Sequence, residues 1–243
     1  MFVGTITNVA AVVAGTTVGA LAGRRFPERL RETVTATLGL LTAGLAVREV
    51  IKTDEFVLVL AAVLAGAVLG ELARIEAGLH RLGDALQRWA GRRAAVALDV
   101  DAPETTAPPE QRGRFSEGFV VASLVFCVGP LAVIGSIQDG LGDPEMLLVK
   151  AALDGFASLA FASVYGWGVG VSALSVGLYQ GAIAFGGRYL EGVLSDPMLD
   201  ALASAGGVLL LGISLRLLGL KEVRVANLLP AVVLAPLFVY LWG

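Results

Sequence analysis

The chain has 243 residues, of which 56% are hydrophobic and only 16% are charged, with a mean hydropathy of +0.78 and a net charge of −3. Soluble globular domains carry about 25% charged residues, so this composition excludes an ordinary soluble protein and places the chain in the membrane class. The slight acidity excludes a nucleic-acid-binding surface, and one Cys and one His exclude an intrachain disulfide and a soft-ligand metal cluster, so no metal or cofactor is expected.

Long apolar stretches recur along the whole sequence. A membrane-spanning helix needs about 20 mainly apolar residues. Eight stretches meet this requirement, at 2–23, 33–51, 56–73, 118–136, 146–165, 169–187, 203–219 and 225–242. We therefore expect an all-α fold: a polytopic transmembrane helix bundle of about eight spans, forming a single membrane domain over residues 1–243.

The charges of the connecting segments alternate. Segments 24–32, 74–115 and 220–224 are rich in Arg and Lys, whereas those near 138–145 and 191–200 are acidic. The positive-inside rule then predicts a multi-pass membrane protein with the basic segments in the cytoplasm and both termini outside. The first apolar run has no basic residue before it, which favours a retained helix over a cleaved signal peptide.

The third connection divides into two parts. Apolar residues recur at spacings of three and four in 73–95, at Ile75, Leu79, Leu82, Leu86 and Trp89, with arginines off this stripe. This pattern predicts an amphipathic helix on the cytoplasmic membrane surface. Residues 99–114 combine several prolines with mixed charge, which predicts a flexible cytoplasmic linker.

Two spans resemble each other closely enough to suggest an internal repeat. Residues 37–48 align without gaps with 205–216, and the alignment matches Gly39, Gly44 and Arg48 with Gly207, Gly212 and Arg216. The loop count makes these two spans antiparallel. Spans 1–3 and 6–8 are therefore predicted to form inverted three-helix repeats, a common arrangement in secondary transporters. The alternative is a chance match between two apolar, Gly-rich helices.

Small residues repeat every four positions in the first and sixth spans. Gly15, Gly19 and Gly23 form one such series, and Gly177 and Gly181 form the other. Glycines at this spacing let two helix backbones approach closely. They predict tight helix packing, and they are also candidate faces for a homo-oligomer.

The fourth span contains a Gly-Pro pair near its middle. Pro130 removes a backbone donor and clashes with the preceding turn, so we expect a kinked or broken helix at Gly129–Pro130. Transporters and channels place ion and substrate groups at such breaks. Ser136, Gln138 and Asp139 follow toward the predicted outer end. The alternative is a simple proline kink filled by neighbouring helices.

Two opposite charges lie in the fifth span. Lys150 and Asp154 are four residues apart, which places them on one helical face within pairing distance. Charges inside a membrane are costly and face a protein interior or a watery cavity. We therefore expect a coupling or gating site in which Asp154 binds a cation or proton and Lys150 is its charge partner. The alternatives are a structural salt bridge, or a Lys150 side chain that reaches the outer interface.

Other polar residues in the spans have simpler interpretations. Asn8, Gln180 and Asn227 are expected to make interhelical hydrogen bonds rather than to bind a ligand. Arg48 and Arg216 lie near span ends, where extension toward the headgroups is the expected role. If the repeat is inverted, the two arginines lie at opposite faces of the membrane, one at each opening of the transport path.

Three functions remain open at this point. The first is a transporter or channel for a small solute or ion, with a path beside the broken fourth helix and the Lys150/Asp154 helix. The second is a non-transporting scaffold or regulatory protein that recruits a partner through 73–95. An enzyme is least favoured, because the sequence has no phosphate-binding loop, nucleophile elbow or zinc motif, and Asp139 with Asp154 is its one candidate carboxylate pair.

Several short motifs carry a resemblance to a known family. They are the stretches 4–8 (Gly-Thr-Ile-Thr-Asn), 27–31, 126–130, 135–140 (Gly-Ser-Ile-Gln-Asp-Gly), Lys150 with 153–155, and 225–230. Together they resemble the YdfK/YqgA-like family of bacterial inner-membrane proteins, which is catalogued as a domain of unknown function. The resemblance covers essentially the whole chain. It implies a multi-span membrane protein, often described in terms of transport, and supplies no substrate or active residue.

Overall fold

The computed structural model describes residues 2–23, 27–97, 109–127, 129–190 and 194–243. These ranges hold only helices, which confirms the all-α class. The elements are α1 (Val3–Gly23), α2 (Glu28–Val50), α3 (Phe56–Ala73), α4 (Ile75–Ala97), α5 (Pro109–Cys127), α6 (Pro130–Leu141), α7 (Glu145–Tyr165), α8 (Gly168–Leu190), α9 (Asp196–Leu217), the 3-10 helix η1 (Val225–Leu228) and α10 (Pro230–Trp242).

Most of these helices are long and apolar enough to cross a membrane. Seven segments meet this test in the described part of the chain, and the number is eight if the bent pair α5–α6 is one span. Within that pair the axes of Arg114–Cys127 and Leu131–Leu141 differ by 65°. The predicted polytopic bundle and the predicted interruption of the fourth span are therefore both confirmed.

Several helices are longer than the apolar stretches predicted. The predicted spans 33–51 and 203–219 begin earlier, at Glu28 of α2 and Asp196 of α9. Acidic residues in a first turn interact favourably with the positive end of the helix dipole, so these polar residues continue the helices beyond the hydrophobic core. The predicted linker 99–114 is wrong in part. Its residues 109–114 belong to α5, which begins at a proline suited to a first helical turn, and residues 99–108 lie outside the described ranges.

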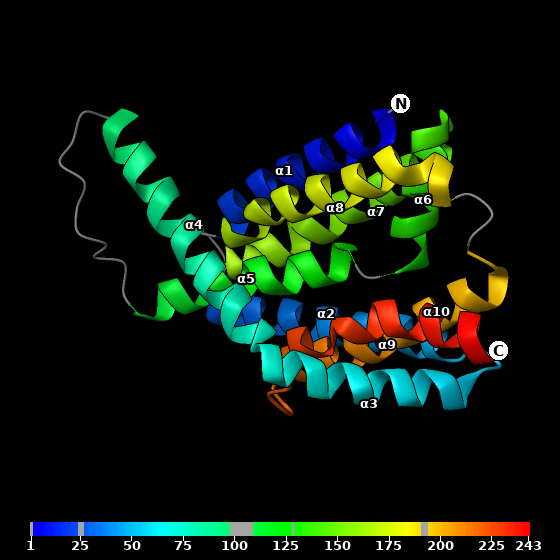
Figure 1. Cartoon of the computed structure of the whole chain (residues 1–243). Coiled ribbons are helices and arrows are strands. Elements are labelled where there is room, and N and C mark those ends of the chain that lie inside the picture. The colour runs from blue at the N-terminus through cyan, green and yellow to red at the C-terminus, as the bar shows by residue number, and fades with distance from the viewer. Residues whose placement is uncertain (1, 24–26, 98–108, 128, 191–193) are drawn as a thin grey trace.

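The helices form two groups that are not consecutive in the chain (Figure 1). One group consists of α1, α5, α6, α7 and α8. The other consists of α2, α3, α9 and α10. Both chain termini lie at the same end of the bundle, while α4 leaves from the opposite end (Figure 1). A buried cluster that includes Phe119 of α5 and Ile213 of α9 extends across both groups.

The amphipathic helix predicted at 73–95 corresponds to α4, which projects obliquely from the bundle (Figure 1). Its apolar residues Ile75 and Leu79 pack against the core, and Gly83 lies against Ser116 and Phe119 of α5. The first half of α4 therefore uses its apolar face to dock on the protein itself. A location of the helix on the membrane surface remains a prediction.

The predicted inverted repeat also remains a prediction. Helices α2 and α9 pack against each other, and the matched Gly39 and Gly207 both lie at their contact. The matched pair Gly44 and Gly212 is less alike, because Gly44 faces open space whereas Gly212 contacts Val225. The third helices of the two predicted repeats, α3 and α10, are also arranged differently. Helix α10 packs along its preceding helix α9, whereas α3 packs mainly along α10.

Candidate functional site

The most extensive helix contact in the described part of the bundle joins α1 to α7, and it is also a close one. A Cβ added at Gly15 or at Gly19 would lie 2.1 Å from the carbonyl oxygen of Gly155 or Leu159, respectively, and one added at Gly23 would lie 2.2 Å from that of Ser163. Each glycine thus meets a residue 140 positions later, as expected for two parallel helices in register. This face of α1 is occupied within the chain, so it is not available to a second copy. An oligomer through Gly177 and Gly181 stays a prediction.

This close contact brings four polar side chains together inside the bundle. Lys150 and Asp154 of α7 form an ion pair, and both side chains are buried. Asn8 of α1 donates from Nδ2 to Asp154 Oδ2 at 2.9 Å and to Gln180 Oε1 of α8 at 3.1 Å. We refer to Asn8, Lys150, Asp154 and Gln180 as the intramembrane cluster. The prediction that Lys150 and Asp154 face inward as a pair is confirmed.

The intramembrane cluster has hydrogen-bonding capacity that the protein leaves unused. Asn8 and Gln180 are both 0% exposed, yet Asn8 Oδ1 and Gln180 Nε2 have no partner among the described residues. Leaving a buried polar atom unsatisfied costs about 1–3 kcal/mol, and each such atom in a native structure requires an explanation. One atom is an acceptor and the other is a donor. A hydrogen-bond donor beside Asn8 Oδ1 and an acceptor beside Gln180 Nε2 would satisfy them.

Asp139 does not belong to this cluster. Its carboxylate is buried and caps the first turn of α1, accepting from the backbone amides of Gly4 and Thr5 at 2.9 Å each and from the Thr5 hydroxyl at 2.9 Å. The first amides of a helix have no partner within the helix, and a carboxylate there also complements the helix dipole. Asp139, predicted as a path residue, is therefore already used to hold the N-terminus of α1.

The remaining predicted path residues lie at the break between α5 and α6 or along α6 itself. Gly129 has φ +142°, a conformation that favours glycine, and Pro130 then starts α6. Ser136 is buried and donates back to the Ala132 carbonyl at 2.5 Å. The Gln138 carbonyl accepts from the Asp143 amide at 2.9 Å, which ends α6. The structure therefore gives Ser136 and the Gln138 backbone local helical roles.

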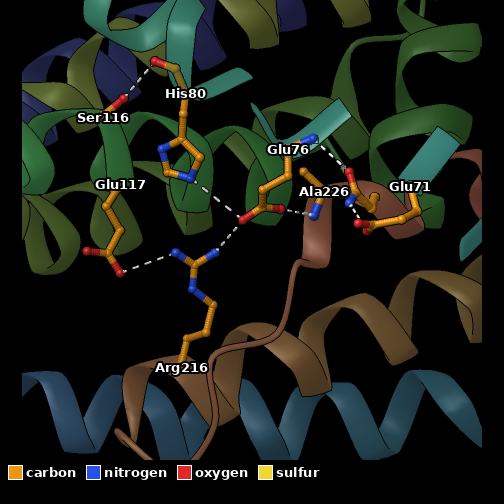
Figure 2. A network of polar contacts seen from close by, with 8 residues as sticks. Glu71, Glu76, His80, Ser116, Glu117, Arg216 and Ala226 are labelled. Atoms are coloured by element: carbon orange, nitrogen blue, oxygen red, sulfur yellow. Dashed lines mark hydrogen bonds and ion pairs between the residues drawn. The ribbon is translucent and has the colours of Figure 1, made fainter. Parts of the chain in front are cut away.

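A second polar network lies where α4 leaves the bundle (Figure 2). Glu76 of α4 accepts from Arg216 Nη1 of α9 at 3.0 Å and from the Ala226 amide of η1 at 2.7 Å. Arg216 Nη2 also lies 3.6 Å from Glu117 of α5, and His80 Nε2 lies 3.6 Å from Glu76. Four elements are thus tied together at the base of α4, and we call this set the α4 anchor.

The α4 anchor corrects one expectation for the arginines. The Arg216 side chain is only 10% exposed and points into the anchor, so it does not extend toward lipid headgroups. Arg48 is 65% exposed and pairs with Glu49 at 3.0 Å, which agrees with a position near the membrane surface. The two matched arginines therefore have different environments.

The anchor also includes the predicted interhelical hydrogen bonds of Asn227. Its Oδ1 accepts from the Glu76 amide at 2.8 Å and its Nδ2 donates to Glu71 at 2.6 Å, while Glu71 also pairs with Arg224. Burial alone would raise the pKa of Glu76. The neighbouring His80 side chain, the hydrogen bond from the Ala226 amide and the Arg216 guanidinium together lower this pKa below its ordinary value.

Sequence reasoning missed Glu76 and Glu117 as partners of Arg216, and Thr5 as a partner of Asp139. The signal for Glu76 was present, because an arginine in an apolar helix requires a carboxylate, and Glu76 begins the amphipathic helix. Among the described residues no group of three or more His, Cys, Asp and Glu side chains forms a metal site.

Comparisons with known proteins agree with the membrane fold. A family model described as "Protein of unknown function (DUF554)" matches residues 3–240. The chain is similar to the uncharacterised protein YqgA of Escherichia coli, with 29% identity over 97% of this chain and 95% of the relative. It is also similar to the uncharacterised membrane protein YdfK of Bacillus subtilis, with 23% identity over 98% of this chain and 95% of the relative. No solved structure matches significantly.

Proposed function

The chain belongs to the DUF554 family of membrane proteins, and from its intramembrane cluster we propose that it carries a small polar solute or ion across the bacterial inner membrane. The observation that carries this proposal is the combination of a buried ion pair with unused hydrogen-bonding atoms among helices long enough to span a bilayer. Ionisable groups at such depth are costly and mark substrate or ion pathways.

The chemistry of the cluster suggests how a solute is held. Asp154 Oδ2 accepts from both Lys150 and Asn8, so an arriving cation or protonated group competes with Lys150 for the carboxylate. Asn8 Oδ1 and Gln180 Nε2 then offer one acceptor and one donor to the solute. Separation of Lys150 from Asp154 is the step that couples binding to a change of conformation. Binding energy comes from hydrogen bonds that the protein alone leaves unmade.

The arrangement of the helices supports the topology that transport would use. Both termini lie at one end of the bundle, and α4 leaves from the other (Figure 1). By the positive-inside rule the end with α4 is cytoplasmic and the termini are outside.

Access of water to the cluster provides a test that needs no known substrate. In a background with Cys127→Ser, we expect Asn8→Cys to react with a membrane-impermeant thiol reagent in intact cells or inverted vesicles. The control on the same helix is Ile6→Cys, whose side chain is 67% exposed on the outer surface of the bundle and should face unreactive lipid. If both cysteines are equally unreactive toward the reagent in intact cells and in inverted vesicles, the result would contradict a water-accessible path.

Flux through purified protein provides the second test. Proteoliposomes with imposed H⁺, Na⁺ or K⁺ gradients are loaded with pH- and potential-sensitive dyes, with and without mixtures of small polar solutes. We expect a protein-dependent signal that Asp154→Asn abolishes and that Asp54→Asn, a change in an exposed loop, preserves. A correctly folded Asp154→Asn protein with undiminished flux would exclude Asp154 from the mechanism.

A scaffold function is the second candidate, and the projection of α4 from the bundle is the observation that favours it (Figure 1). In that case partner binding depends on α4 and its anchor and is insensitive to the intramembrane cluster. Neutralising Lys150 and Asp154 together therefore separates the two candidates, because the double change spares a scaffold and disables a transporter.

A further inference from the structure

Two adjoining cavities lie at the end of the bundle opposite the chain termini. Their volumes are about 400 Å³ and about 430 Å³, and both are lined by Arg31, Arg114, Val164 and Tyr165. These residues come from α2, α5 and α7, and the end of α1 closes the first cavity at Gly23. The first cavity includes no residue of the intramembrane cluster or of the α4 anchor, whereas the second borders the anchor at Glu117. The first cavity therefore requires its own explanation.

The first cavity is positively charged. Arg31 and Arg114 are the charged residues in its lining, and none of the ion pairs found in the described ranges includes either of them. Carboxylates enter only in the second cavity, at Glu28, Glu32 and Glu117. Charge is therefore divided across the two cavities, and an anion would be attracted to the first.

Arg31 has donors that the protein does not use. A guanidinium carries five N–H donors. Arg31 Nη2 donates to the Gly23 carbonyl at 3.1 Å, while the enclosed Nε has no partner among the residues that the structure describes. An oxyanion with two oxygens matches the planar fork of a guanidinium and would supply the acceptor that Nε lacks. Phosphate and carboxylate groups have this geometry.

The surroundings favour a phosphate that belongs to a lipid. The first cavity is also lined by Phe115, Tyr165 and the exposed Trp167, and it opens at the ends of membrane-spanning helices. Trp and Tyr are enriched at the membrane–water interface, at the depth of the headgroups. Basic cavities between spanning helices at that depth bind anionic headgroups. We propose that this cavity binds the phosphate of an anionic phospholipid through Arg31 and Arg114, linking α1, α2, α5 and α7.

This inference does not depend on the proposed transport function, and it is tested by binding to the full-length purified protein. Thermal stability in detergent and native mass spectrometry are measured with added phosphatidylglycerol, with phosphatidylcholine, and with inorganic phosphate alone. We expect phosphatidylglycerol to raise the melting temperature and to remain bound, and the other two probes to have little effect.

Variants then assign the effect to the cavity. The double change Arg31→Gln with Arg114→Gln should weaken phosphatidylglycerol binding by about tenfold to a hundredfold, because each charge-assisted hydrogen bond contributes at that scale. Arg29→Gln is the matched control, since Arg29 is exposed on the same helix and outside both cavities. Arg31→Lys keeps the charge and the fold but loses the fork, and an intermediate loss is expected.

Three outcomes would overturn the proposal. Equal phosphatidylglycerol binding by the wild type and a folded double variant would remove the two arginines from the site. The same loss in Arg29→Gln would indicate a general surface charge effect. Stabilisation by inorganic phosphate as large as that by phosphatidylglycerol would show that the ligand is a free anion and not a lipid headgroup.

Discussion

Asn8 and Gln180 are 172 positions apart in the chain, yet the side-chain amide of Asn8 donates to that of Gln180 at 3.1 Å. Both side chains are fully buried, and each keeps one polar atom that has no partner in the described part of the chain. The contact therefore joins α1 to α8 and is also the least satisfied part of the intramembrane cluster. A structural hydrogen bond alone would not require the unused Asn8 Oδ1 and Gln180 Nε2.

The first prediction concerns the charge balance of the cluster. Lys150→Met leaves the Asp154 carboxylate buried without its cation, a change that costs about 3–5 kcal/mol when a buried pair is broken. Combining it with Asp154→Leu removes both charges, and we expect most of the lost stability to return. Thermal unfolding of the detergent-purified proteins measures this. If the single and double variants unfold at the same temperature, the pair is not coupled in the folded protein.

A second prediction compares two glycines. Gly19→Val places side-chain atoms on the Leu159 carbonyl, where even a Cβ would lie at 2.1 Å, so α1 cannot seat against α7. We expect little folded protein, measured as monodisperse yield after extraction. Gly44→Ala is the control, because nothing lies within 4 Å of the added Cβ and Ala is the better helix former by about 1 kcal/mol. Comparable losses in both variants would argue against the α1–α7 contact.

The third prediction concerns the cap of α1. Asp139→Ala leaves the Gly4 and Thr5 amides without their acceptor, and we expect a loss of about 1–3 kcal/mol. Hydrogen–deuterium exchange should accelerate at the first turn of α1 and not at the first turn of α9. Unchanged exchange at Gly4 and Thr5 would show that Asp139 does not hold this helix end.

The fourth prediction concerns pH and the α4 anchor. The pKa of Glu76 is lower in the folded protein than its ordinary value of 4.5, so its contribution to stability is fully present above pH 4.5 and is lost as the pH falls through the folded-state pKa. Limited proteolysis within α4 should therefore increase at acidic pH. Glu76→Gln should give increased cleavage already at neutral pH, whereas Asp84→Asn on the same helix should not. If cleavage of Glu76→Gln within α4 depended on pH in the same way as cleavage of the wild type, the result would contradict this role of Glu76.

The fifth prediction concerns orientation. With Cys127→Ser as background, Ser195→Cys should react with an impermeant reagent in intact cells, and Thr105→Cys should react only after the membrane is opened. The expectation comes from the alternation of loop charge. Labelling of Thr105→Cys from outside would reverse the proposed topology.

The sequence was most informative where a local rule determines structure. Span length predicted the helices, the Gly-Pro pair predicted the break at Gly129, and four-residue spacing predicted the Lys150–Asp154 pair. Each of these depends only on neighbours within a few positions. The ends of α2 and α9 were misplaced because polar first turns continue a helix beyond its apolar core.

The partners of these residues depended on tertiary packing and were not predictable from spacing. Asp139 was interpreted as a path residue because a carboxylate in a span suggests chemistry, and its actual use is to cap a helix 134 positions earlier. Arg216 was expected to extend toward lipid, but Glu76 and Glu117 are brought beside it by the docking of α4 on α5. The glycines that seat α1 on α7 explain why Asn8 reaches Asp154 at all.

The capping of α1 by Asp139 has a consequence for how the protein is made. Helix α1 is synthesised before the other described helices, yet its amide end and Asn8 bond to residues 139, 154 and 180. More than half of the chain must leave the ribosome before the first of these partners exists. Although α1 precedes the other described helices, it is therefore among the last of them to be fixed in place, and a ribosome that stops before α6 releases a chain in which α1 has no permanent position.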